Sequence, residues 1–132
     1  MTTHVRGEFD VKMRPQGSDP ALGDVPARFG LDKRFHGALD ATSKGQMLAF
    51  RSAVEGSAGY VAMELVDGML EGRRGTFVLQ HSGTMTRGAA HLALTVVPDS
   101  GTGELAGLQG AMGIEITGGK HYYVFDYSIE PD

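Results

Sequence analysis

The sequence predicts an all-β fold, an eight-stranded antiparallel barrel whose strands follow one another up and down. Several stretches alternate apolar and polar residues with a period of two, as half-buried strands do. Glycine supplies 20 of the 132 residues without a fixed period, which is typical of tight turns and strand bends. About eight such stretches follow one another through short connections with no obvious covering helix, and closure into a barrel removes the free sheet edges.

Length and composition predict one β-barrel domain over residues 1–132. The net charge of −4 and the lack of a basic stripe give no reason to expect a nucleic-acid partner. The chain has no cysteine, which excludes disulfides, thiolate metal sites and cysteine nucleophiles. No apolar run is long enough for a membrane span, and the N-terminus lacks the apolar segment of a signal peptide. We therefore expect a cytoplasmic protein with no membrane partner.

The first half of the chain holds three predicted strands. Residues 5–13 alternate cleanly, whereas residues 28–39 do so less regularly. Between them, residues 15–26 contain three prolines and two glycines, which predicts a loop. Residues 46–55 fit either a short strand or one face of a helix, and the surrounding strands favour the strand.

The second half holds five predicted strands. The segments GYVAMELVDGML and GTFVLQHSGTM flank EGRRG as a hairpin, and AHLALTVV follows as a third strand. The turn-rich PDSGTGEL leads to LQGAMGIEI, whose two internal glycines loosen the strand pattern. Gly118–Gly119 predicts a two-residue hairpin turn before the last strand, KHYYVFDYSI.

The hairpin around Gly72 determines which side chains share a face. A two-residue loop, either Glu71–Gly72 or Gly72–Arg73, puts Glu64 and His81 on the same face, and the second register puts them directly opposite each other. A three-residue loop would instead bring Gln80 to that face, because a one-residue slip flips every side chain. The rest of the face is mostly apolar, so we expect it to line the barrel. Its other members are Tyr60, Ala62, Val66, Phe77, Leu79, Leu92, Leu94 and Val96.

Glu64 and His81 are the candidate catalytic pair. A buried carboxylate can orient an imidazole, or either group can move a proton. The alternative is a structural ion pair that fills the barrel. The candidate ligand-binding residues are the hydroxyl-bearing Tyr60, Tyr123 and Tyr127, with Phe77 and Leu79 as an apolar wall. The alternative for all five is aromatic and aliphatic core.

Other chemistries find little support in the sequence. The five histidines show no His-x-His or His-x-x-x-His spacing, so we expect no metal site and no cofactor. Gly101-Thr102-Gly103 lacks the strand–loop–helix context of a phosphate loop and is interpreted as a turn. No G-x-S-x-G motif is present to indicate a serine hydrolase.

Three segments together resemble a known bacterial family over about residues 28–130. They are GSAGYVAMELVDGMLEGRRGTFVLQHSGTM, LTVVPDSGTGELAGLQG and HYYVFDY, and they resemble the domain-of-unknown-function family numbered thirty-two twenty-four. Asp99 stands where that family usually has glycine. The resemblance implies an eight-stranded barrel similar to allene oxide cyclases, plant enzymes that cyclise an unsaturated fatty-acid epoxide inside the barrel. Related bacterial barrels close polyketide rings. No cyclase motif is matched here residue by residue.

Three functions remain open at this point. The first is a barrel that holds an apolar small molecule and performs cyclase- or isomerase-like chemistry with Glu64 and His81. The second is a carrier or binder with the same cavity and no chemistry. The third is a structural module whose interior is filled. Outward apolar residues such as Met63, Leu65 and Val78 also predict an interface in a homo-oligomer.

Overall fold

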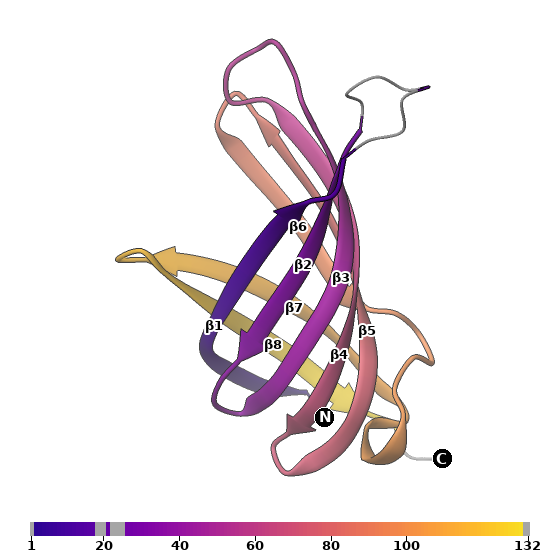
Figure 1. Cartoon of the computed structure of the whole chain (residues 1–132). Coiled ribbons are helices and arrows are strands. Elements are labelled where there is room, and N and C mark those ends of the chain that lie inside the picture. The colour runs from indigo at the N-terminus through magenta and orange to yellow at the C-terminus, as the bar shows by residue number, and fades with distance from the viewer. Residues whose placement is uncertain (1, 18–20, 22–25, 131–132) are drawn as a thin grey trace.

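A computed structural model describes residues 2–17, 21 and 26–130. Eight antiparallel strands form a closed barrel in which each strand pairs with its neighbours in sequence and β8 pairs with β1 (Figure 1). The strands are β1 (Thr3–Pro15), β2 (Ala27–Phe35), β3 (Leu39–Arg51), β4 (Ala58–Leu70), β5 (Arg73–Thr86), β6 (Ala89–Val96), β7 (Leu108–Thr117) and β8 (Lys120–Ile129). A short 3-10 helix, η2 (Gly103–Leu105), lies between β6 and β7. The predicted fold class is confirmed.

Two strand boundaries in the first half differ from the prediction. The stretch 28–39 is not one strand, because β2 ends at Phe35 and a turn through Gly37 leads to β3 at Leu39. Gly37 has φ +96°, which breaks the strand, although the alternating pattern continues on both sides. The stretch 46–55 is strand only as far as Arg51. Of the predicted loop 15–26, residues 18–20 and 22–25 lie outside the described residues.

The β4–β5 hairpin selects one of the two predicted registers. Leu70 pairs with Arg73, so the loop is Glu71–Gly72, and both loop residues have the positive φ of a tight hairpin turn. Glu64 therefore pairs with Leu79, and His81 lies diagonally across from it rather than directly opposite. The predicted two-residue turn at Gly118–Gly119 also forms.

Asp99 occupies a backbone position that suits glycine. Its φ of +62° lies in the left-handed region. Aspartate tolerates this region better than most residues because its short side chain can form local hydrogen bonds. The turn can therefore keep its shape with either residue.

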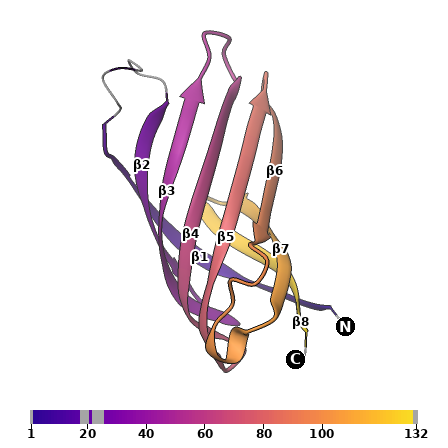
Figure 2. The same cartoon turned by 90° about the vertical axis from the view of Figure 1, so that its right-hand side faces the viewer.

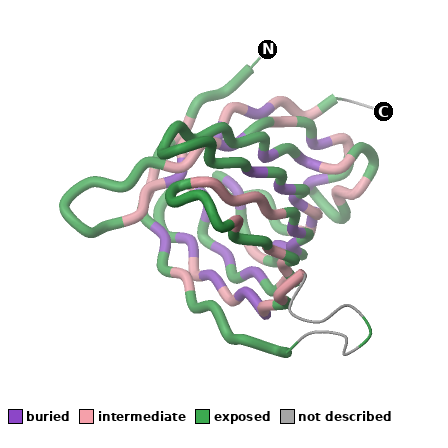
Figure 3. Tube along the Cα trace, turned by 90° about the horizontal axis from the view of Figure 1, so that it is seen from above, coloured by how far each residue is buried: buried purple, intermediate pink, exposed green. Residues whose placement is uncertain are grey.

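Buried and exposed residues alternate along the strands, as Figure 3 shows. The face of β4 and β5 that was predicted to line the barrel points inward. On β4 the inward residues Ala62, Glu64 and Val66 are buried, whereas the outward Met63 and Leu65 are 48% and 52% exposed. The homo-oligomer interface predicted at the outward residues remains a prediction.

The two ends of the barrel differ. At the closed end, η2 lies beside the β4–β5 turn (Figure 2). There the β2–β3 and β4–β5 turns are joined by a hydrogen bond from Glu71 N–H to Ala38 O, and Leu105 of η2 is buried. At the open end, the β3–β4 connection is joined to the β5–β6 turn by a hydrogen bond from Gly88 N–H to Gly56 O. In the described part of the chain, β6 pairs with β7 only through Thr95 and Ala111.

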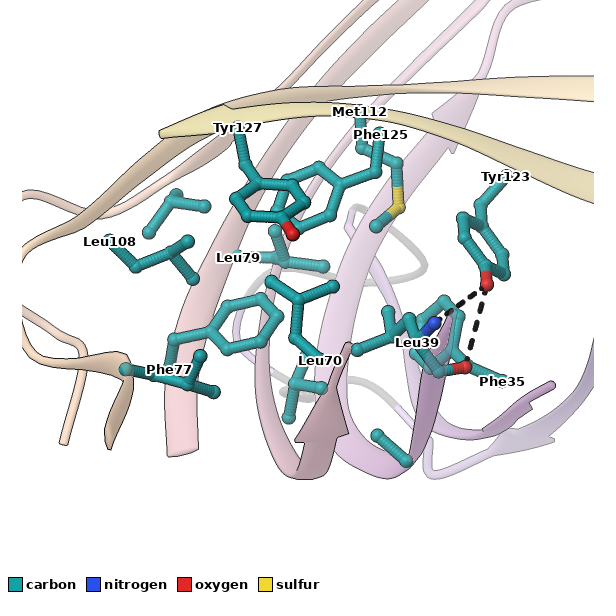
Figure 4. Packing of buried hydrophobic residues seen from close by; sticks show 14 of the residues in the cluster. Phe35, Leu39, Leu70, Phe77, Leu79, Leu108, Met112, Tyr123, Phe125 and Tyr127 are labelled. Atoms are coloured by element: carbon teal, nitrogen blue, oxygen red, sulfur yellow. Dashed lines mark hydrogen bonds between the residues drawn. The ribbon is translucent and has the colours of Figure 1, made fainter. Parts of the chain in front are cut away.

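The hydrophobic core fills the closed end (Figure 4). The rings of Phe77 and Phe125 stack with centroids 6.0 Å apart. The Tyr123 hydroxyl accepts a hydrogen bond from Leu39 N–H at 3.0 Å and donates one to His36 O at 2.8 Å, which ties β8 to the β2–β3 turn. No helix within the described ranges is long and apolar enough to cross a membrane.

Candidate functional site

A cavity of about 610 Å³ occupies the open end of the barrel. Its volume falls within the range of small-molecule sites, and its wall is largely apolar. Within the described part of the chain, no lysine or carboxylate side chain belongs to the lining. The lining comprises Met13, Ala27, Phe29, Met47, Ala49, Phe50, Arg51, Ala58, Gly59, Tyr60, Gly83, Thr84, Met85, Ala90, His91, Leu92 and Ile114.

A buried charged cluster, formed by Lys33, Ser43, Glu64 and His81, lies between this cavity and the packed core. Lys33 Nζ donates a hydrogen bond to Glu64 Oε2 at 2.9 Å, and Ser43 Oγ donates one to Oε1 at 2.7 Å. His81 Nε2 contacts Oε2. The Glu64 side chain is 0% exposed, and both of its carboxylate oxygens are occupied.

The environment of Glu64 keeps it ionised. Burial raises the pKa of this carboxyl, but the interaction with the His81 ring and the positive charge of Lys33 outweigh burial and lower the pKa from 4.5 to about 2. A carboxylate with such a low pKa is a poor general base near neutral pH. The arrangement suits Glu64 for holding Lys33 and His81 in place rather than for exchanging a proton with a ligand.

The sequence predicted the contact between Glu64 and His81 but missed Lys33 and Ser43. Lys33 occupies the same alternating positions as Phe29, Leu31 and Phe35, all of which face inward or are partly buried on β2. A lysine at such a position needs an acidic partner inside the barrel. The inward position of Lys33 in the alternating pattern was therefore the signal that could have predicted its pairing with a buried carboxylate. Ser43 gave no comparable signal.

The lowered pKa of Glu64 predicts an acid-sensitive contribution to stability. Because the folded pKa lies below the unfolded value of 4.5, the contribution is fully present above about pH 4.5 and is lost as the pH falls through about 2. It amounts to about 3 kcal/mol. Urea unfolding between about pH 5 and 2 should show a flatter pH dependence for Glu64→Gln than for the wild type. Identical slopes in the two proteins would contradict this prediction.

Tyr60 joins the cavity to the charged cluster. It lines the cavity, and its ring centroid lies 6.3 Å from that of His81. The ring crosses Gly83, where a Cβ would lie 2.3 Å from the nearest ring carbon, so glycine at this position makes room for the tyrosine. Burial, and then the negative charge of Glu64, raise the pKa of the Tyr60 hydroxyl. The hydroxyl therefore keeps its proton near neutral pH.

The other four predicted ligand-binding residues do not line this cavity. Phe77, Leu79, Tyr123 and Tyr127 belong to the packed core toward the closed end. Besides the bonds of Tyr123 described above, the Tyr127 hydroxyl donates a hydrogen bond to Glu71 Oε1. Burial and this carboxylate raise the pKa of Tyr127 to about 12. These residues face inward as predicted, but their height along the barrel separates them from the cavity.

No cluster of three or more histidine, aspartate or glutamate side chains suited to a metal ion occurs among the residues that the structure describes. The candidate site is an apolar cavity with Tyr60 beside a cluster in which Lys33 and Glu64 form a buried ion pair.

These features define a small antiparallel β-barrel with a packed closed end and a hollow open end. The chain belongs to DUF3224, a family described as protein of unknown function, which matches residues 5–127. It is similar to a protein of unknown function from the DUF3224 family of Shewanella oneidensis MR-1, whose crystal structure is 51% identical in sequence, with all of both chains covered and a TM-score of 0.94. No curated protein matches the chain. The family resemblance is confirmed, and the likeness to allene oxide cyclase remains a prediction.

Proposed function

We propose that this protein binds an apolar small molecule in the cavity at the open end of the barrel. The observation that carries the proposal is the cavity of about 610 Å³ with its largely apolar wall. Its rim leaves several large apolar side chains accessible, among them Met13, Phe50 and Met85, which are 49%, 48% and 42% exposed. Apolar surface gathered around a concavity favours a ligand site over a filled structural module.

Binding without chemistry is better supported than catalysis by Glu64 and His81. Both oxygens of Glu64 already have partners, and its low pKa makes it a weak base. Neither residue lines the cavity. A cyclase or isomerase would need one of them to touch the substrate, so we favour a carrier or binder and expect the cluster to fix the floor of the cavity.

A fluorescent probe tests this proposal. N-Phenylnaphthylamine is uncharged and carries no oxygen, and its emission rises in apolar surroundings. We expect it to bind the wild type and to bind Ala49→Trp at least about tenfold more weakly, because Ala49 lines the cavity and the indole would fill part of it. Leu48→Trp is the matched control. Leu48 is the neighbour of Ala49 in the sequence, but its side chain is 42% exposed and does not line the cavity.

The proposal fails if the wild type does not bind the probe, or if the two tryptophan variants bind it equally well. Native mass spectrometry of protein purified from a bacterial host extends the test. A retained small molecule that disappears in Ala49→Trp would identify the class of ligand. The same spectra would show whether the protein is a homo-oligomer.

A further inference from the structure

Tyr60 differs from the other polar residues that line the cavity. Arg51, Thr84 and His91 lie at the exposed rim, where water can satisfy them. Tyr60 is half-buried, and its hydroxyl has no hydrogen-bond partner within the described residues. By contrast, the hydroxyls of Tyr123 and Tyr127 both have partners. A hydroxyl in an apolar cavity generally finds a partner when it is removed from water, so Tyr60 has a donor available for a ligand.

The surroundings of Tyr60 favour an uncharged partner. Glu64 lies below it on the same face of β4, and the ammonium of Lys33 is already paired with that carboxylate. An anionic group in the depth of the cavity would lose its hydration without gaining a free cation. A cationic group would find no carboxylate among the described residues of the lining.

We infer that the ligand is an apolar molecule with an uncharged oxygen acceptor, such as a ketone or ester carbonyl, and that this oxygen accepts a hydrogen bond from the Tyr60 hydroxyl. The inference rests on the proposed function. The acceptor lies at the inner end of the ligand, beside Tyr60 and Gly83, and the apolar remainder extends toward the rim past Ala58 and Met85. Gly83 is needed for this position of Tyr60, because any larger residue there would displace the tyrosine ring.

Two probes and one pair of variants test the inference. Prodan is an apolar naphthyl ketone whose emission shifts to longer wavelength when its carbonyl accepts a hydrogen bond, whereas N-phenylnaphthylamine has no oxygen. Tyr60→Phe keeps the ring and removes the hydroxyl. We expect it to weaken prodan binding about fivefold and to shift the emission of the bound probe to shorter wavelength. Binding of N-phenylnaphthylamine should not change.

Tyr122→Phe is the matched control, because Tyr122 packs beneath Arg6 and does not line the cavity. It should leave the binding of both probes unchanged. The inference is overturned if Tyr60→Phe leaves prodan affinity and emission unaltered, or if it weakens both probes equally. If the wild type binds neither probe, the proposed function itself fails, and the inference fails with it.

Discussion

Lys33→Met is expected to lower the free energy of unfolding at neutral pH by about 3 to 5 kcal/mol. The Lys33 side chain is 6% exposed and donates to Glu64, whose side chain is fully buried. Methionine has a similar length and removes the ammonium alone. The Glu64 carboxylate then stays inside the barrel in contact with Ser43 and His81, but the ammonium that balanced its negative charge is gone. Urea unfolding followed by circular dichroism measures the change.

Two further variants separate the loss of the charge from the loss of the side chain. Lys33→Met combined with Glu64→Gln removes both charges and should recover at least half of the lost stability, because a neutral pair carries no uncompensated charge. Lys120→Met breaks an exposed pair with Glu8, at 3.6 Å, and should cost less than about 1 kcal/mol. If Lys33→Met costs no more than Lys120→Met, the cluster does not have the energetic role given to it here.

The sequence predicted the faces of the strands well because the side-chain period of a strand is two. Any two-residue loop between β4 and β5 puts Glu64 and His81 on the same side, so their meeting did not depend on the choice of register. The diagonal arrangement did depend on it, and the positive φ values of Glu71 and Gly72 decided it. Lys33 was missed because it reaches Glu64 across β3, and the registers of β2 with β3 and of β3 with β4 cannot be obtained from alternation alone.

Alternation indicates a face but not a height along the barrel. Tyr60 and Tyr123 both point inward, yet one lines the cavity and the other is held in the core by the backbone of the β2–β3 turn. The height follows from the stagger of the strands and from η2, which closes one end with Leu105. A short 3-10 helix in a turn-rich segment has no periodic signal, so the sequence could not show which end is filled.

Phe77→Ala is expected to lower the free energy of unfolding by about 3 to 5 kcal/mol. Phe77 is 1% exposed and stacks on Phe125 at the closed end, where tightly packed neighbours can collapse only partly into the space left by the ring. Phe29→Ala is the matched control, because Phe29 is half-buried and already borders the cavity. It should cost only about 1 kcal/mol, since the lost ring adds to an existing hollow. Thermal or urea unfolding distinguishes the two.

The variants Phe77→Ala and Phe29→Ala also distinguish a residue of the packed core from a residue of the ligand-binding wall. N-Phenylnaphthylamine should bind folded Phe77→Ala as tightly as the wild type and should bind Phe29→Ala more weakly, because only Phe29 lines the cavity. The opposite pattern, with binding lost in Phe77→Ala under conditions where it is still folded, would move the ligand to the closed end and make Phe77 the wall that the sequence first predicted. Phe77→Ala should lose more stability but keep its affinity for the probe, whereas Phe29→Ala should lose less stability but bind the probe more weakly. A general loss of folding cannot produce this pattern.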